Sequence, residues 1–187
     1  MRTPDYPIET TRLTLRPFTE DDLEGLHAYQ RLPEVTRYLY WDPRDEAEVR
    51  ESIRKRVAVP TLAKEGDVLV LAVVLRATGE LVGEVNLFWL SEQFRQGEFG
   101  FVFHPAHHGH GYAREASVEI LRLGFEVFGL HRIVGRCDGR NEASARLLAK
   151  LGLRREAHFV QNEIVKGEWT DELVFAMLAD EWAEARS

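Results

Sequence analysis

The stretch HPAHHGHGYAREA, residues His104–Ala116, joins an apolar run that Pro105 stops to a run with helical spacing that starts near Gly111. The first backbone N–H groups of a helix lack intrahelical acceptors, and the helix dipole places roughly half a positive charge at that end. Gly109 and Gly111 carry no Cβ, so their amides can approach a ligand closely. Arg114, one turn into the helix, adds a fixed positive charge. This strand, loop and helix therefore predict a phosphate or diphosphate site.

Other types of ligand loop fit the stretch less well. The Rossmann fingerprint needs a further glycine and a following parallel strand, whereas the strands before this loop have the pattern of an antiparallel meander. A Walker A loop needs Gly-Lys followed by Ser or Thr, which is absent. Four histidines within seven residues leave a zinc site as an alternative, although the loop before Tyr112 contains no Cys or carboxylate. We expect no metal, with each histidine packing within the loop.

Hydrophobic periodicity on both sides of the loop predicts the other elements. Expected strands lie around Leu13 and Leu15 and at 68–75, 81–90, 97–105, 131–137, 158–165 and 171–178. Expected helices follow a capping box at Thr19 and Asp22, contain Val49, Ile53 and Val57 before Pro60, and cover 112–128 and 141–151. The run VLVLAVVL at 68–75 is typical of a strand covered on both faces. The predicted fold class is α/β (α+β), a mixed and mostly antiparallel sheet of about six or seven strands flanked by about four helices.

Composition indicates a single domain over residues 1–187. A chain of 187 residues with 44% hydrophobic content buries one substantial core. The single Cys137 excludes an internal disulfide and fits a reducing compartment, so we expect a cytoplasmic protein. No apolar run approaches the ~20 residues of a membrane span. A net charge of -7 disfavours nucleic acid. We expect a monomer or homodimer without membrane or nucleic-acid partners.

Four motifs, in this order and over nearly the whole chain, resemble the GNAT superfamily of acyl-CoA N-acyltransferases. They are ETTRLTLRPFTEDD at 9–22, HPAHHGHGYAREA at 104–116, NEASARLLAKLGL at 141–153 and GEWTDELVFAML at 167–178. Within the superfamily they resemble the ribosomal-protein N-terminal acetyltransferase-like branch. The resemblance implies a single N-acetyltransferase domain that transfers an acyl group, most often acetyl from acetyl-CoA, to a primary amine on a protein N-terminus or a small molecule.

The resemblance also implies which residues hold coenzyme A. The family loop starts with Gln or Arg, where this chain has His108, and continues at Gly111 and Ala113. The strand before the loop is expected to bind the pantetheine arm through its backbone and to donate an N–H to the oxyanion, exposed by a bulge or splay. The expected cofactor-binding residues are Phe101, Val102, Phe103, His108, Gly109, His110, Gly111, Tyr112, Ala113, Arg114 and Asn141, of which Asn141 also suits a helix N-cap.

Amine acylation needs a neutral nucleophile, because an alkylammonium has no lone pair. By the resemblance, Glu98 on the strand before the loop is the expected base, relaying a proton through water. Burial beside Phe99 and Phe101 is expected to raise its pKa towards the working range. Glu84 is the competing carboxylate, and strand alternation favours a solvent-exposed position for it.

The remaining candidates concern the leaving group and the acceptor. Ser144 shares a helical face with Leu147 and Leu148, so its hydroxyl points inward and is a candidate acid for the departing thiolate. Other family members carry a Tyr acid where this chain has Leu148. The residues expected to border the acceptor are Tyr38, Tyr40, Trp41, Trp169 and Asp171. The alternative function is a non-catalytic acyl-CoA sensor on the same fold, because binding needs only the loop and strand backbone.

Overall fold

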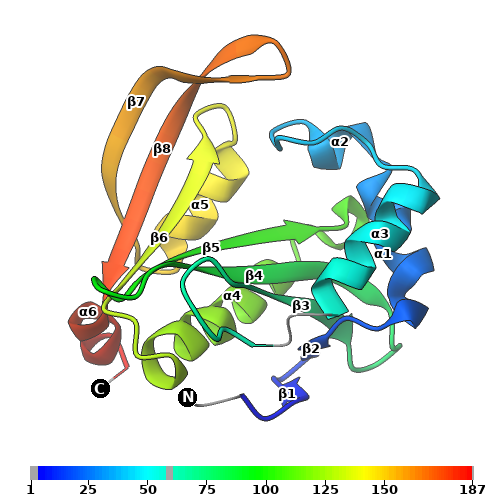
Figure 1. The fold of residues 1–187 in the computed structure, drawn as a ribbon, viewed down its shortest axis with the longest axis horizontal. Helices are drawn as coiled ribbons and strands as arrows, with labels where there is room; N and C mark the ends of the chain where they lie inside the picture. Colours follow the sequence, from blue (N-terminus) through cyan, green and yellow to red (C-terminus); the bar gives the residue numbers. More distant parts are fainter. Residues whose placement is uncertain (1–3, 58–60, 187) are drawn as a thin grey trace.

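The computed structural model describes residues 4–57 and 61–186, which contain an eight-stranded sheet in the order β1-β2-β3-β4-β5-β6-β8-β7 (Figure 1). The strands are β1 (Ile8–Glu9), β2 (Leu13–Pro17), β3 (Val68–Leu75), β4 (Leu81–Ser91), β5 (Gln96–Phe103), β6 (Arg132–Asp138), β7 (Arg154–Val165) and β8 (Glu168–Leu178). Every neighbouring pair is antiparallel except β5 and β6, which are parallel. The prediction of a mixed, mostly antiparallel sheet is confirmed.

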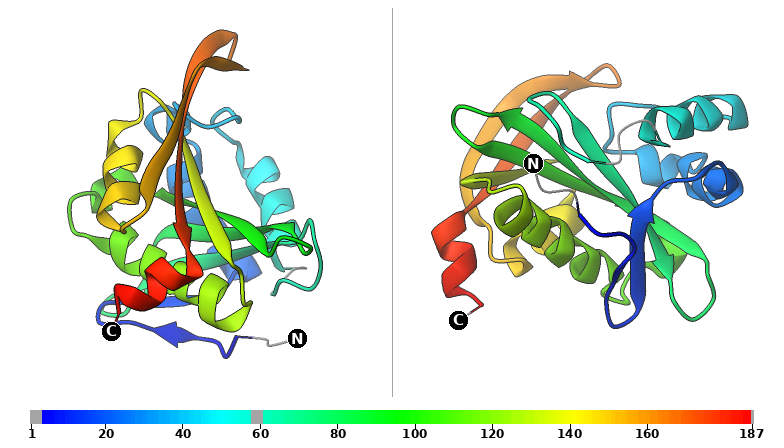
Figure 2. Two further views of the ribbon diagram at one scale, coloured as in Figure 1. Left: turned by 90° about the vertical axis from the view of Figure 1, so that its left-hand side faces the viewer. Right: turned by 60° about the horizontal axis from the view of Figure 1, so that its bottom comes forward.

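Helices cover both faces of this sheet (Figure 2). They are α1 (Leu23–Gln30), α2 (Pro33–Thr36), α3 (Glu46–Val57), α4 (Tyr112–Arg122), α5 (Glu142–Lys150) and α6 (Ala179–Glu184). One core cluster joins the sheet to Ala116 and Ile120 of α4 and Leu148 of α5. The other joins it to Leu26 and Tyr29 of α1 and Val49 and Ile53 of α3. The sheet is therefore the middle layer between two helical layers.

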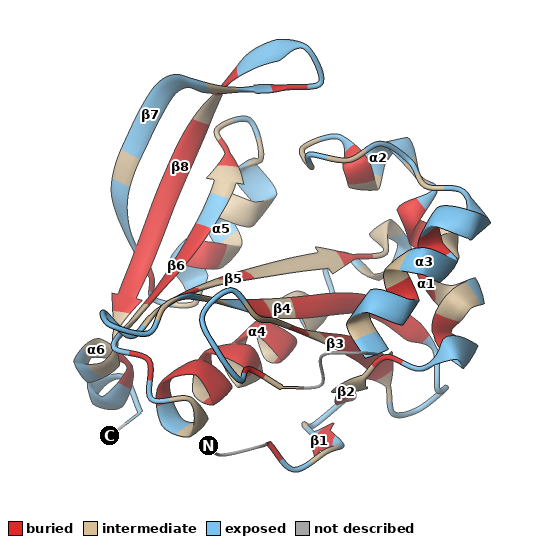
Figure 3. Cartoon of the chain, in the orientation of Figure 1, coloured by how far each residue is buried: buried red, intermediate tan, exposed pale blue. Residues whose placement is uncertain are grey.

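Strand β3 shows why an uninterrupted apolar run fits this position. Leu69, Leu71 and Val73 belong to the cluster with α4, whereas Ala72 and Val74 belong to the cluster with α1 and α3. Successive side chains of a strand point to opposite faces, so both sets are buried only when both faces are covered. Figure 3 shows the buried residues concentrated in the central strands. The prediction that this strand is covered on both sides is confirmed.

The described residues contain more elements than the sequence predicted, which was six or seven strands and about four helices. The additional elements are β1, α2 and α6, which are two, four and six residues long. Elements this short cannot show the periodicity that identifies a helix or strand in a sequence. α3 ends at Val57, and the predicted stop at Pro60 lies outside the described residues. Within the described residues no helix combines the length and the apolar character that crossing a membrane requires.

The prediction that Glu84 is solvent-exposed is wrong. Its side chain is buried and accepts hydrogen bonds from Tyr29 Oη at 3.0 Å and Arg56 Nη2 at 2.8 Å. Alternation placed Glu84 on the correct face, but that face is covered by α1 and α3 rather than by water. A buried carboxylate is stable only when it is paired and hydrogen-bonded, and Arg56 provides the pairing charge from α3.

Replacing Glu84 with Ala is expected to lower the free energy of unfolding by about 3 kcal/mol or more, because Arg56 is left buried without its partner. Urea denaturation measures this loss. The control is Glu46→Ala, which breaks an exposed pair with Arg50 on α3 and should cost below about 1 kcal/mol. Equal losses in the two variants would show that the buried pair does not anchor α3 to the sheet.

Candidate active site

Strands β5 and β6 are paired over a short distance only. Their parallel register pairs Gln96 with Arg132, Gly97 with Ile133 and Glu98 with Val134. Beyond Glu98 the two strands are no longer paired, although β5 continues to Phe103. The splay that was expected on this strand is therefore present, and it begins at Glu98.

Backbone direction along β5 decides which groups face the splay. His104 N donates to Val82 O of the β4 side at 2.9 Å, and backbone groups in an antiparallel pair alternate from residue to residue. Val102 therefore points its N–H and C=O to β4, so its backbone does not face the splay. Phe101 and Phe103 point to the β6 side, where Phe103 O already accepts a bond from His108 Nε2 at 3.2 Å. Phe101 presents both an N–H and a C=O to the splay.

The loop after β5 has the geometry of an anion site. Pro105–His107 form a 3-10 turn, and Gly109 and Gly111 have φ values of 81° and 80°. An added Cβ at Gly109 meets nothing within 4 Å, so this glycine is required by its backbone angle and lies on an open side. α4 starts at Tyr112 without a side-chain cap. The N–H groups of its first turn therefore remain available to an anion, as predicted.

Each histidine of the loop has its own partner. His104 Nδ1 accepts from Ala106 N at 3.1 Å, and His107 Nε2 lies 2.9 Å from Glu80 Oε1. His108 turns back to Phe103 O, and His110 stacks on Tyr112 with ring centroids 5.6 Å apart. In the part of the chain that the structure describes, no group of three or more potential metal ligands forms. The histidines shape the loop instead, and His108 faces its own strand.

Glu98 lies at the point where the splay begins. Its carboxylate is 3.1 Å from Arg136 Nε of β6 and is partly buried. Burial raises the pKa of Glu98 and the nearby Glu172 adds to this effect, whereas Arg136 opposes it. The predicted direction of the pKa shift and its cause, burial, are correct, but Phe99 and Phe101 do not provide the burial, because they point to the opposite face of β5. A half-buried carboxylate with a raised pKa is suited to accept a proton near neutral pH.

Sequence reasoning missed the partners of Glu98. Arg136 lies between two carboxylates, since its Nη1 also contacts Glu172 Oε1 at 3.2 Å. Glu172 of β8 is buried and accepts a bond from Asn162 Nδ2 at 3.1 Å. Side-chain alternation in β6 and β8 can predict that Arg136 and Glu172 share a sheet face, but only once it is known that these two strands are neighbours. No local signal identified this group.

Tyr40 joins the same region from the opposite end of the chain. Its hydroxyl donates to Glu163 at 2.8 Å, and Lys166 Nζ donates to Thr36 O at 2.9 Å. The β7–β8 hairpin thus contacts the last residue of α2 and the segment that follows it. Desolvation first and the hydrogen bond to Glu163 next raise the pKa of Tyr40, with smaller effects from the charges of Glu172 and Glu98. Tyr40 therefore contacts the acidic Glu163 of the hairpin, and its role as an acceptor residue stays a prediction.

The helix α5 begins directly after the open end of β6. Asn141 Oδ1 accepts a bond from Ser144 N at 3.1 Å, which confirms the predicted N-cap. Ser144 is half-buried, and no side-chain partner for its hydroxyl occurs among residues 4–57 and 61–186. Leu148 is buried and packs beside Gly135 of β6. The Tyr acid of other family members is therefore replaced here by a core residue.

The other predicted acceptor residues lie elsewhere. Trp41 packs under Arg44, with Arg44 Cζ 4.3 Å from the ring centroid. Asp171 accepts bonds from Gln161 N at 2.9 Å and from His158 at 2.6 Å, so it holds the β7–β8 hairpin. By strand alternation Asp171 and the exposed Trp169 lie on the sheet face opposite Glu172. Asp171 and Trp169 are therefore directed away from the face of Glu98, and the acceptor role of Trp41 stays a prediction. Tyr38 lies beneath Arg37 and Arg140.

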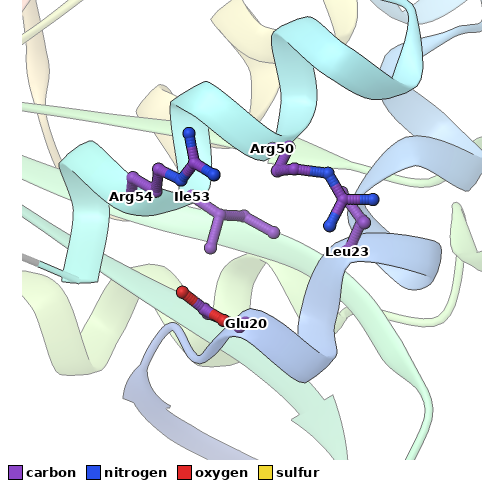
Figure 4. Close-up of a pocket in the computed structure, with 5 residues that line it drawn as sticks. All are labelled: Glu20, Leu23, Arg50, Ile53 and Arg54. Carbon is purple, nitrogen blue, oxygen red and sulfur yellow. The ribbon is translucent and has the colours of Figure 1, made fainter.

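A small hollow of about 40 Å³ lies between the start of α1 and α3, lined by Glu20, Leu23, Arg50, Ile53 and Arg54 (Figure 4). This volume holds only a few water molecules. None of the residues around the splay lines it. It is therefore not a candidate for binding the substrates.

Comparison with known proteins agrees with this geometry. A family model described as an acetyltransferase (GNAT) domain matches residues 12–154. The uncharacterized N-acetyltransferase YnaD of Bacillus subtilis is 33% identical over 176 residues, which cover 94% of this chain and 98% of that protein. The ribosomal protein uS5-alanine N-acetyltransferase of Escherichia coli is 24% identical over 188 residues, covering 98% and 96%.

Solved structures share the fold. The crystal structure of a GNAT-family acetyltransferase from Bacillus anthracis has a TM-score of 0.84 and 30% identity, covering 93% of this chain and 99% of that chain. A spermidine N-acetyltransferase from Vibrio cholerae, in complex with CoA and spermine, has a TM-score of 0.79 and 23% identity, covering 93% and 99%. The family model and these relatives agree with the splayed parallel strands and the uncapped glycine loop. The chain therefore belongs to the GNAT family and is an acetyl-CoA-dependent N-acetyltransferase.

Proposed function

We propose that acyl transfer takes place where β5 and β6 separate, by direct attack of a primary amine on the thioester. The observation that carries this proposal is the end of strand pairing at Glu98 and Val134. It leaves an ionisable carboxylate beside unpaired backbone on one strand. Much of the rate in a direct transfer comes from holding both substrates side by side, and the splay offers a place for the donor arm next to Glu98.

The residues divide the chemistry as follows. Glu98 accepts the proton that the ammonium acceptor loses, and the free lone pair then attacks the carbonyl carbon. A carbon–nitrogen bond forms, the carbon–sulfur bond breaks, and Phe101 N–H stabilises the negative charge that develops on the carbonyl oxygen. As the carbon–sulfur bond breaks, Ser144 donates its hydroxyl proton to the departing thiolate and takes up the second proton of the attacking nitrogen. The products are the amide, the free thiol and a neutral hydroxyl, and the proton held by Glu98 passes to solvent. No covalent intermediate on the protein is needed.

The loop from His108 to Arg114 is the proposed grip for the diphosphate of coenzyme A. Two glycines with positive φ and an uncapped helix start support this role, because both leave N–H groups free for an anion. The side chain of His108 contributes no contact, since it bonds to Phe103 O. Asn141 supports the site indirectly by capping α5.

The acceptor is proposed to be a primary amine that approaches over Tyr40, Glu98 and Glu172. Three carboxylates, including Glu163, favour the cationic form in which an amine arrives. A protein N-terminus, as the resemblance to the ribosomal-protein branch suggests, and a polyamine, as in the Vibrio cholerae relative, both satisfy this condition. Thiol release from acetyl-CoA across a panel of peptides and small amines distinguishes them. If no acceptor of the panel caused thiol release, the result would support the sensor instead. The named relatives do not favour that alternative.

Replacing Glu98 with Gln keeps the size of the side chain and removes the base, so kcat should fall by about 100-fold or more. The Kd for coenzyme A should remain nearly unchanged, because the diphosphate loop is intact. Steady-state kinetics and calorimetry measure the two quantities. The exposed Glu92→Gln variant at the β4–β5 turn is the control. Full turnover of the Glu98 variant at neutral pH would remove Glu98 from the mechanism.

Removing the guanidinium in Arg136→Ala should raise the pKa of Glu98 further, because Arg136 is the group that lowers it. Glu98 must be ionised to accept a proton, so activity falls as the pH drops through this pKa. The acid limb of kcat/KM against pH should therefore move to higher pH. Arg146→Ala, which removes an exposed arginine of α5, should leave the limb in place. A limb that stays or moves to lower pH in Arg136→Ala contradicts the assignment.

Replacing Ser144 with Ala should lower kcat by about ten-fold if the hydroxyl protonates the thiolate. The N-cap is kept, because Asn141 bonds to the backbone N–H of residue 144 and not to its side chain. Asn141→Ala is the contrast and should cost about 1 kcal/mol of stability instead. Kinetics and thermal melting together separate the two effects, and unchanged kcat in Ser144→Ala would assign the proton to water.

A further inference from the structure

Arg12, the residue before β2, contacts the loop from 98 residues away in sequence. Its Nη1 donates to His110 O at 2.8 Å. Its Nε and Nη2 bind Glu115 Oε2 at 2.8 and 2.7 Å, and its Cζ lies 4.7 Å from the centroid of Tyr112. One guanidinium therefore joins the last part of the loop to the first turn of α4.

The partner of Arg12 is itself held in place. Glu115 Oε1 accepts bonds from Arg12 N at 2.9 Å and from Thr10 Oγ1 at 2.6 Å. Burial raises the pKa of Glu115, but the bonds from Thr10 and Arg12 outweigh it and leave this pKa below its usual value. Glu115 is therefore ionised at neutral pH and presents a fixed acceptor to the arginine.

The loop needs such a support. Gly109 has open space around it, and no described residue accepts a hydrogen bond from the N–H of Gly109, His110 or Gly111. Gly109 and Gly111, which flank His110, also leave the unbound loop many backbone conformations. Fixing the backbone of one residue costs about 1–2 kcal/mol of conformational entropy. Among the described residues, Glu80 contacts His107 and Phe103 contacts His108, whereas Arg12 provides the hydrogen bond from a distant segment to the part between Gly109 and Gly111.

Peptide geometry gives the contact with His110 a direction. The carbonyl of His110 and the N–H of Gly111 belong to one planar trans peptide, in which they point opposite ways. With the carbonyl fixed on Arg12, the N–H of Gly111 faces away from β2. The same guanidinium lies 3.4 Å from the place of a Cβ at Gly111, so it also closes the inner side of the turn.

We infer that Arg12 is a positioning residue for the donor site: it turns the Gly111 amide outward and preorganises the loop for the diphosphate of coenzyme A. This inference rests on the proposed role of the loop. It predicts an effect on donor binding and little effect on stability, because exposed ion pairs contribute about 0–1 kcal/mol to folding. The chemical step, which uses Glu98 and Phe101, should be unaffected once the donor is bound.

Calorimetry with coenzyme A provides the first test. Arg12→Ala should weaken binding by about ten-fold, because the loop loses the charge-assisted hydrogen bond that orders it before the donor binds. Arg12→Lys should recover part of this affinity, because an ammonium reaches one acceptor but not both. The control is Arg122→Ala, which removes an ion-paired arginine from the other end of α4 and should bind like the parent. Thermal melting of each variant without ligand establishes that it is folded.

Donors with and without the diphosphate provide the second test. Arg12→Ala should lose about ten-fold in kcat/KM with acetyl-CoA through a higher KM at similar kcat. With acetyl-pantetheine, which lacks the diphosphate, its kcat/KM should equal that of the parent. An equal loss with both donors, or unchanged affinity for coenzyme A, would overturn the inference. If the parent protein itself fails to bind coenzyme A, the proposed function fails first.

Discussion

The limited pairing of β5 with β6 is the constraint on which the rest of the site depends. Three parallel residue pairs hold the strands together, and beyond Glu98 the backbone of β5 has no strand partner on that side. Unpaired backbone is costly when it is buried, so a sheet retains such an opening only where another group can satisfy it. An extended pantetheine arm with its own amides is a suitable group. The opening also places the Phe101 N–H and the Glu98 carboxylate three residues apart on the same strand, both beside the splay.

Ion pairs at two places on one face of the sheet serve different purposes. Beneath α1 and α3, the Glu84–Arg56 pair is closed off from water and stabilises the packing of α3. Further along the same side, Arg136 is shared between Glu98 and Glu172 and remains partly exposed. A shared and partly hydrated arginine leaves Glu98 able to change its protonation state. The same pair of residue types is thus structural in one place and titratable in the other.

Support for the loop comes from the edge of the sheet. α4 and Gly111 supply the N–H groups of the proposed site, and the N–H of Gly111 takes its direction from the His110 peptide, whose carbonyl Arg12 holds from the start of β2. The opposite end of the molecule is organised in a similar way, since Tyr40 and Lys166 join the α2 segment to the β7–β8 hairpin. The proposed donor and acceptor regions are each stabilised by contacts between segments that are distant in sequence.

The sequence by itself determined the features that depend on neighbouring residues. Its periodicity identified the main strands and helices, Asn141 was recognisable as a cap, and Gly109 and Gly111 marked the anion loop before α4, because these signals arise within a few residues. The resemblance added the family, which the relatives confirm. It also pointed to Glu98, whose role stays a prediction.

Only the tertiary structure decided which side chains meet. Glu84 is buried because α1 and α3 cover its face, and Trp169 is separated from Glu98 because β8 presents it to the other side. Arg136 meets both Glu98 and Glu172 because β6 lies between β5 and β8, an order that no local pattern contains. Burial and ion pairing depend on contacts between distant segments, and a single sequence without strand order does not specify them.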